Sequence, residues 1–175
     1  YMDVDLALGL VRGIDGTTFT ITVQTGQQEP RELTITRKTT NPQMVFTDML
    51  DEQIGYINIV EFSGDVATSF ANALLTMEKE KAKGAVVDLR GLQRGNMSNV
   101  VEVLDLLLPE GEIAYVMSKG GKGTVWATTQ TNPNTLPLTI IVDEQTTGVS
   151  EVFAAVLQEK GRASIVGQIQ QEKPI

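Results

Sequence analysis

The chain has 175 residues, enough for one full domain and a fragment of another, and its 41% hydrophobic and 21% charged residues are typical of a globular protein. Acidic side chains outnumber basic ones by 22 to 14, and the resulting net charge of −8 repels nucleic acids and anionic lipid surfaces, so we expect neither as a partner. Cysteine and histidine are absent, which excludes disulfides, thiol nucleophiles, histidine-dependent triads and histidine-ligated metals, and leaves lysine or carboxylates as the strong bases.

The first forty residues are predicted to form a short helix followed by a strand hairpin. Leucine and valine recur from Asp3 to Arg12, after an acidic start and before Gly13, which predicts a short capped helix. Apolar residues alternate with threonine over 18–24 and 32–38, on either side of a polar connection. This alternation predicts two antiparallel strands.

The next forty residues predict a second pair of strands and a helix. Residues 44–50 and 54–60 are rich in β-branched and aromatic side chains and flank a polar turn. The charged stretch from Asp65 to Lys83 has apolar residues at helical spacing, and we expect this helix to end at Gly84.

From residue 84 onward, strand patterns alternate with helix patterns. The predicted strands are 85–89, 112–117, 124–128, 138–142 and 163–166, and the predicted helices are 98–108 and 149–160. We interpret the glycine-rich stretch Lys119 to Gly123 as a hairpin turn. The alternation predicts a mixed α/β fold in which helical crossovers join parallel strands.

Several strings in this half of the chain resemble the carboxyl-terminal processing, or tail-specific, serine proteases. They are IGYINIVEFS at 54–63, GAVVDLRG at 84–91, LLLPEGEIAYV at 106–116 and LTIIVDEQTTGVSEVFAAVLQEKGRASIVGQ at 138–168. The earlier helix and hairpin patterns resemble the end of the PDZ domain that precedes the protease core in that family. The resemblance therefore implies the C-terminal part of a PDZ domain at 1–39 and a core with the ClpP/crotonase-like layered sheet-helix fold at 40–175.

The catalytic serine of the family is missing from this chain. The family uses a serine and a lysine, and the resemblance puts the serine at Gly148, which has no hydroxyl with which to form an acyl-enzyme. The family lysine falls on Lys173, although Glu172 and Pro174 replace its flanking glycines, and a solvated lysine near a terminus is the alternative. We therefore expect a catalytically inactive homologue, a pseudoprotease.

The loop that would bind the oxyanion is also altered. Of the two glycines that the family has in this loop, only the second is kept, as Gly95, and Arg94 replaces the first with a bulky cation. The resemblance implies that Gly95 and Val149 would supply the backbone N–H groups of an oxyanion-like site.

Ser150 is the one residue that could restore a nucleophile next to the lost serine. It keeps open the alternative of an active Ser-Lys type serine endopeptidase that cleaves unstructured C-terminal regions of proteins. Because residues two apart in the first turn of a helix point to different sides, we expect Ser150 to face away from the cleft and to have a capping or structural role. Ser98 is expected to cap the helix that it precedes.

The remaining candidates have simpler interpretations. Acidic pairs within 3–5, 51–52 and 110–112 lie at turns or helix starts, where solvated acids are common, so we expect no metal site and no cofactor. Trp126 lies in a strand pattern and is expected to be half buried.

The resemblance also implies partners and a location. We expect protein or peptide segments as partners and an extracytoplasmic location, in the cell envelope or secreted. Because related cores self-associate, a homo-oligomeric structural module is a third hypothesis. No apolar run approaches the roughly 18 residues of a membrane helix, so we expect no membrane insertion within this chain. Tyr1 is not an initiating residue, and we expect the chain to be a piece of a longer precursor.

Overall fold

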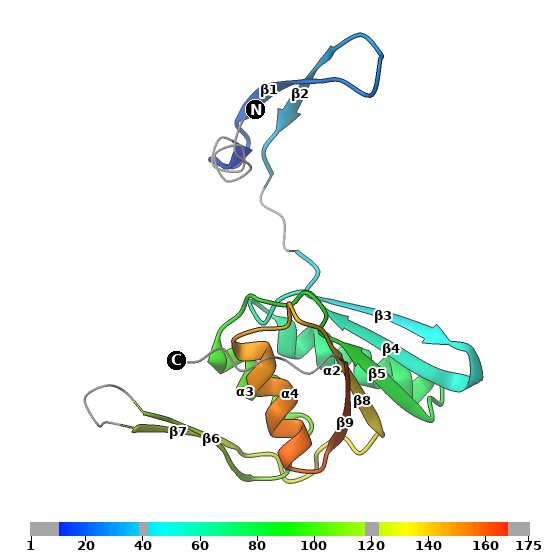
Figure 1. Cartoon of the computed structure of the whole chain (residues 1–175), viewed down its shortest axis with the longest axis vertical. Coiled ribbons are helices and arrows are strands. Elements are labelled where there is room, and N and C mark those ends of the chain that lie inside the picture. Colours follow the sequence, from blue (N-terminus) through cyan, green and yellow to red (C-terminus); the bar gives the residue numbers. More distant parts are fainter. Residues whose placement is uncertain (1–10, 39–41, 118–122, 168–175) are drawn as a thin grey trace. The chain divides into compact units, whose positions relative to one another are not determined.

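A computed structural model describes residues 11–38, 42–117 and 123–167 of the chain (Figure 1). The chain divides into two compact units, Tyr1–Pro42 and Gln43–Ile175, which are considered separately below. The helix predicted over 3–12 lies outside the described residues except for its last two positions.

In the described part of the first unit, β1 (Thr18–Val23) and β2 (Arg31–Thr36) form an antiparallel hairpin. Phe19 lies opposite Ile35, and the guanidinium of Arg37 lies 4.5 Å from the centre of the Phe19 ring. This confirms the two predicted antiparallel strands. Their assignment to a PDZ domain remains a prediction.

The second unit is built on a five-stranded sheet of order β3-β4-β5-β8-β9. Its strands are β3 (Val45–Leu50), β4 (Ile54–Ile59), β5 (Gly84–Asp88), β8 (Leu138–Val142) and β9 (Ala163–Gly167). β3 is antiparallel to β4, after the short 3-10 turn η1 (Asp51–Gln53), and the other neighbours are parallel.

Helices connect the parallel strands, as predicted. They are α2 (Val66–Lys79) between β4 and β5, α3 (Met97–Asp105) after β5, and α4 (Val149–Glu159) between β8 and β9. A separate antiparallel pair, β6 (Gly111–Met117) and β7 (Gly123–Thr128), lies between α3 and β8. The predicted turn of this pair lies largely outside the described residues. The mixed α/β fold expected from the sequence is confirmed.

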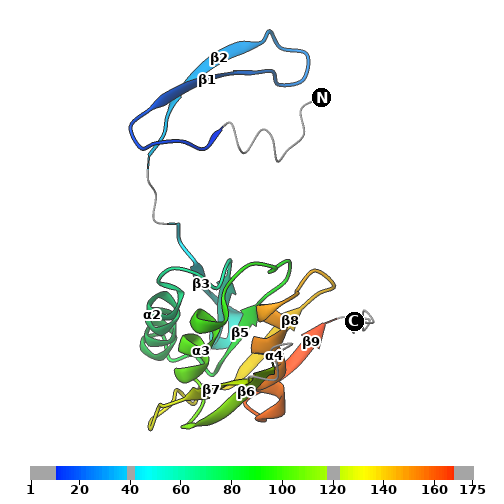
Figure 2. The same ribbon diagram turned by 90° about the vertical axis from the view of Figure 1, so that its left-hand side faces the viewer.

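The three helices lie on one face of the sheet, which Figure 2 shows behind them. Alternate strand side chains point toward the helices, so that Ile57, Val87 and Ile140 are fully buried beneath them. The rings of Phe62 and Phe153 meet in this core with their centres 5.1 Å apart. The core therefore holds the loops that follow β4, β5 and β8 on a rigid base.

The end of α2 differs from the prediction. The helix stops four residues early because Lys81 adopts a left-handed conformation, φ 58°, and the N–H of Ala82 donates to the carbonyl of Met77 across 2.9 Å. Gly84 is thus not the terminator of the helix but the first residue of β5, where its backbone passes close to Pro137.

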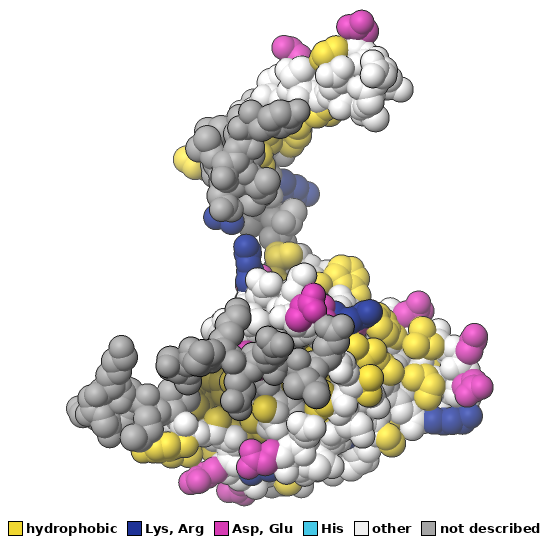
Figure 3. All heavy atoms as spheres, viewed as in Figure 1, with side chains coloured by type: hydrophobic (Ala, Val, Ile, Leu, Met, Phe, Trp, Pro, Cys, Tyr) yellow, Lys and Arg dark blue, Asp and Glu magenta, His cyan; other side chains and the backbone are white. Residues whose placement is uncertain are grey.

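The other face of the sheet carries partly exposed apolar side chains. They are Phe46, Leu50, Ile54, Tyr56, Val86, Ile141 and Val166. Among the described elements no helix covers this face, and Figure 3 shows hydrophobic side chains gathered over β3 and β4. None of the helices in the described ranges is long and apolar enough to cross a membrane.

Candidate functional site

Two loops meet at one end of the sheet. Residues 89–96 follow β5 and residues 143–148 follow β8, and because these strands are parallel neighbours, their carboxyl ends lie at the same edge. Figures 1 and 2 both show the green and orange loops side by side there. This edge contains the sequence positions where the family resemblance predicts chemistry.

Gly148 forms a sharp turn from β8 into α4. Its backbone has φ 67° and ψ −127°, a conformation that disfavours residues with a side chain. A Cβ atom built on Gly148 would have the carbonyl oxygen of Gln93, 4.0 Å away, as its nearest neighbour. The turn therefore has a sharp strand-to-helix geometry of the kind that exposes a nucleophile in some hydrolases, and the space beside it is open, but glycine places no side chain there.

Glu151 stabilises this turn from the first turn of α4. Its carboxylate accepts a hydrogen bond of 2.9 Å from the N–H of Gly148. A carboxylate at this position also interacts favourably with the positive end of the helix dipole. Val149, the first residue of α4, carries one of the N–H groups that lack an acceptor within the helix itself.

Ser150 is fully buried beneath the turn. Its hydroxyl lies 2.6 Å from the carbonyl oxygen of Leu92 and 2.7 Å from that of Thr147, and its single proton serves these two acceptors. The N–H of Thr147 also donates to Leu92, across 3.1 Å. Ser150 therefore joins α4 to the loop after β5.

Asp143 and Thr146 make a second connection between the loops. The hydroxyl of the fully buried Thr146 donates to the carbonyl of Leu89 across 2.9 Å. The Asp143 carboxylate accepts from the N–H groups of Gly91, at 2.9 Å, and Gln145, at 3.1 Å. The bond from Gly91 is the main cause that lowers the pKa of Asp143, so this carboxylate remains charged and holds both loops.

A second carboxylate, which the sequence analysis did not identify as a site residue, fixes the start of the loop after β5. Asp88 is only 2% exposed, and it accepts from the Tyr56 hydroxyl at 2.7 Å and from the Arg90 guanidinium at 2.6 Å. Burial acts to raise the pKa of Asp88, but the hydrogen bonds from Arg90 and Tyr56 outweigh it, and the pKa is lowered. In the sequence, the signal that could have identified this ion pair is an aspartate and an arginine two positions apart at the end of a predicted strand.

Gly95 has a packing role in the same loop. A Cβ atom on Gly95 would lie 2.5 Å from the Cβ of Phe62, and its φ of 150° is also unusual for other residues. The N–H of Phe62 donates to Arg94 and its carbonyl accepts from Asn96, at 3.3 and 2.9 Å. Glycine is thus required for close contact with Phe62, whatever else its N–H does.

Three further sequence candidates are Ser98, Trp126 and Lys173. Asn96, and not Ser98, caps α3, because the helix begins one residue earlier than predicted and the Asn96 side chain accepts from the N–H of Asn99 at 2.9 Å. Trp126 packs partly buried against the core, as expected. Lys173 lies outside the described residues. Within the described ranges, no three acidic side chains gather closely enough to hold a metal ion.

The chain matches proteins of known family along most of its length. Residues 53–174 match peptidase family S41. The chain is 30% identical over 168 residues to the carboxy-terminal processing protease CtpA of Bacillus subtilis, covering 95% of this chain and 36% of that protein. It is 28% identical over 172 residues to a carboxyl-terminal-processing protease of Synechocystis, covering 95% of this chain and 40% of that protein.

Solved structures agree on the fold. A photosystem II D1 C-terminal processing protease superimposes with a TM-score of 0.63 at 19% identity, over 87% of this chain and 44% of that one. A lipoprotein from Streptococcus agalactiae gives a TM-score of 0.59 at 20% identity, over 73% and 50%. The family match and the relatives confirm the resemblance seen in the sequence motifs, and the solved structures confirm the fold. The chain spans little more than a third of the length of the curated relatives, 36% and 40%.

Proposed function

We propose that this chain, which belongs to peptidase family S41, is a catalytically inactive member that binds protein or peptide segments at the two loops beside Gly148 and does not cleave them. The observation that carries the proposal is the absence of any side-chain oxygen at Gly148. Without an attacking atom at the head of α4, an acyl-enzyme has no first bond to form.

The surrounding loops support a binding role. The side chains of Asp143, Thr146 and Ser150 join the loop after β5 to the turn before α4 through three hydrogen bonds, and the N–H of Thr147 adds a backbone bond to Leu92, which holds the two loops in one conformation. A preorganised surface loses less entropy when it binds an extended segment. The Gly148 position adds room where the family has a side chain.

The alternative, an active serine endopeptidase that uses Ser150, receives less support. The Ser150 hydroxyl would have to leave the carbonyls of Leu92 and Thr147 and emerge from a fully buried position in the first turn of α4. Breaking these buried hydrogen bonds costs about 0.5–1.5 kcal/mol each, although the Leu92 carbonyl keeps the N–H of Thr147 as a donor.

Labelling with a fluorophosphonate probe tests the proposal. The wild-type protein should remain unlabelled and should leave an unstructured substrate such as casein uncleaved, while fluorescence anisotropy should still report casein binding. The Gly148→Ser variant provides a reference, since it returns a hydroxyl to the turn. Labelling of any serine in the wild-type protein, or its cleavage of casein, would refute the proposal of inactivity.

Self-association is a second candidate role, favoured by the apolar face of the sheet. Phe46, Leu50 and Val166 on that face are 48%, 46% and 55% exposed. Apolar patches of this kind commonly mark interfaces. Light scattering at several concentrations should show a dimer that Phe46→Glu weakens and Val125→Glu, on the separate hairpin, does not. A monomer at every concentration would exclude this role.

The family resemblance further supports an extracytoplasmic location, in the cell envelope or secreted. Fractionation of the source cells, with an antibody against the chain, tests this proposal. Recovery in the cytoplasmic fraction alone would contradict it.

A further inference from the structure

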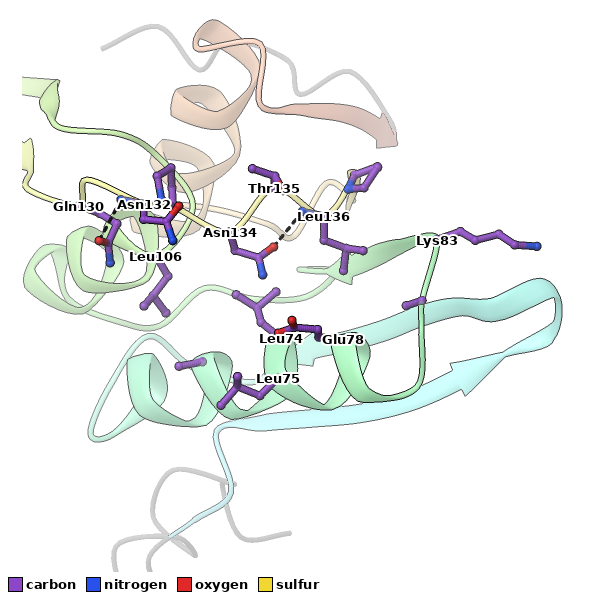
Figure 4. Close-up of a pocket in the computed structure, with 14 residues that line it drawn as sticks. Leu74, Leu75, Glu78, Lys83, Leu106, Gln130, Asn132, Asn134, Thr135 and Leu136 are labelled. Carbon is purple, nitrogen blue, oxygen red and sulfur yellow. Dashed lines mark hydrogen bonds between the residues drawn. The ribbon is translucent and has the colours of Figure 1, made fainter.

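A hollow of about 790 Å³ opens at the end of the sheet opposite to Gly148. We name it the α2 hollow, because α2 forms one wall and the segment 130–137, before β8, forms the other (Figure 4). None of the residues in the two loops beside Gly148, 89–96 and 143–148, lines this hollow. Its chemistry is therefore independent of the missing nucleophile.

Aliphatic side chains form the base of the α2 hollow. Leu74 and Leu75 come from α2, and Leu106 and Leu136 approach from the other elements. Leu74 is buried, whereas Leu75 is 53% exposed and available for contact with a ligand. The base therefore favours an aliphatic group.

Carboxamide groups line the facing wall in a fixed orientation. The side-chain oxygen of Gln130 accepts from the N–H of Asn132 at 3.2 Å, and that of Asn134 accepts from the N–H of Leu136 at 2.9 Å. Since the oxygens are used within the segment, the NH2 groups are the atoms left to face outward. Figure 4 shows Asn134 extending toward Leu74 and Glu78 on α2, across the hollow.

The segment that carries these donors is held firmly in place. The N–H of Asn134 donates to the carbonyl of Leu106 at 2.9 Å. Arg162 holds the carbonyls of Asn134 and Leu136 from the other side, at 2.9 and 2.8 Å. The donors are thus preorganised and would lose little entropy on binding.

Charge narrows the choice of ligand. Glu78 faces the hollow, and the Lys83 side chain points away from it in Figure 4. A carboxylate beside the site repels phosphates, fatty acids and other anions. The ligand atoms that accept hydrogen bonds from the NH2 groups of Gln130 and Asn134 must then be neutral. A polypeptide supplies such neutral acceptors, its backbone carbonyls, together with aliphatic side chains.

We propose that the α2 hollow is a second polypeptide-binding site, which takes an extended, uncharged segment with aliphatic side chains. The proposal extends the binding role proposed above to a separate surface. Leucine or valine side chains of the bound segment pack on Leu75 and the partly exposed Leu136, and its carbonyls accept hydrogen bonds from Gln130 and Asn134.

Binding of a labelled, capped hexapeptide of alternating leucine and serine tests this site by fluorescence anisotropy. The double variant Gln130→Glu and Asn134→Asp keeps the two acceptor oxygens that the segment needs but removes both donors, so its affinity should fall at least tenfold. The control pair Asn72→Asp and Gln158→Glu adds the same charge on exposed helix positions outside the hollow and should bind within twofold of wild type.

Side-chain amide signals in NMR spectra locate the peptide directly. The signals of Gln130 and Asn134 should shift during titration. If the double variant binds as well as wild type, and signals at 91–95 and 148–150 shift, then the hollow is not the site although the proposed binding role survives. If the hexapeptide binds nowhere, the hollow proposal fails, and fluorophosphonate labelling still decides the question of catalytic inactivity separately.

Discussion

The hydroxyl of Ser150 lies 2.6 Å from the carbonyl oxygen of Leu92, which joins the buried side of α4 to the loop after β5. Ser150, two residues beyond Gly148, thus holds together the two loops at this edge of the sheet. Its hydrogen bonds have a measurable consequence for stability.

Ser150→Ala should lower the free energy of unfolding by about 1–3 kcal/mol, because it removes the buried donor to two carbonyls. Urea denaturation measures the loss. Ser164→Ala, at an exposed position of β9, is the matched control and should change stability by less than about 0.5 kcal/mol. Equal effects of the two substitutions would show that the Ser150 contacts contribute nothing.

Alanine at Gly148 and at Gly95 should have different effects. Gly148→Ala should cost about 1–3 kcal/mol, from backbone strain alone, since the nearest atom to the new methyl group, the Gln93 carbonyl oxygen, lies 4.0 Å away and does not collide with it. Gly95→Ala adds a collision with Phe62 and should cost about 3–5 kcal/mol. Urea denaturation of the two variants measures these losses of stability. A larger loss for Gly148→Ala than for Gly95→Ala would contradict the contact distances at the two glycines.

Stability should depend on pH through Asp143. The pKa of this group in the folded protein is lowered, chiefly by the hydrogen bond from Gly91, so the folded state binds fewer protons than the unfolded state near the unfolded pKa. Its contribution is therefore fully present above the unfolded pKa and is lost as the pH falls through the lower, folded pKa.

Asp143→Asn provides the comparison for this pH dependence. The variant should be less stable than wild type at neutral pH, and the difference should shrink as the pH falls below about 4, because the wild-type carboxyl becomes protonated. Urea denaturation of both proteins at a series of pH values measures this difference in stability. A difference that stays constant with pH would show that the charge of Asp143 is unimportant.

Arg162→Ala should lower the free energy of unfolding by about 2–4 kcal/mol, because it leaves the carbonyls of Leu107, Asn134 and Leu136 without their charged donor. Thermal unfolding measures the change. Arg31→Ala, on an exposed position of β2, removes the same charge without these contacts and should have little effect.

Local sequence patterns predicted most of the elements of the second unit. The β-branched and aromatic residues over 54–60 and the apolar run over 138–142 predicted β4 and β8 to within a residue, because these patterns depend on neighbouring positions only. The end of α2 was missed because Lys81 adopts a conformation that composition does not indicate. The cap at Asn96 was missed because a one-residue shift of the helix start changes which side chain reaches its N–H groups.

The sequence by itself determined that residue 148 has no attacking oxygen, since the identity of one side chain decides this whatever the fold. Only the tertiary structure decided that Tyr56 bonds to Asp88, 32 positions away, that Gly95 touches Phe62, and that Ser150 points at Leu92. These contacts join segments that are distant in the chain. Their distances depend on how the strands pair and how the helices pack, and no local pattern contains that information.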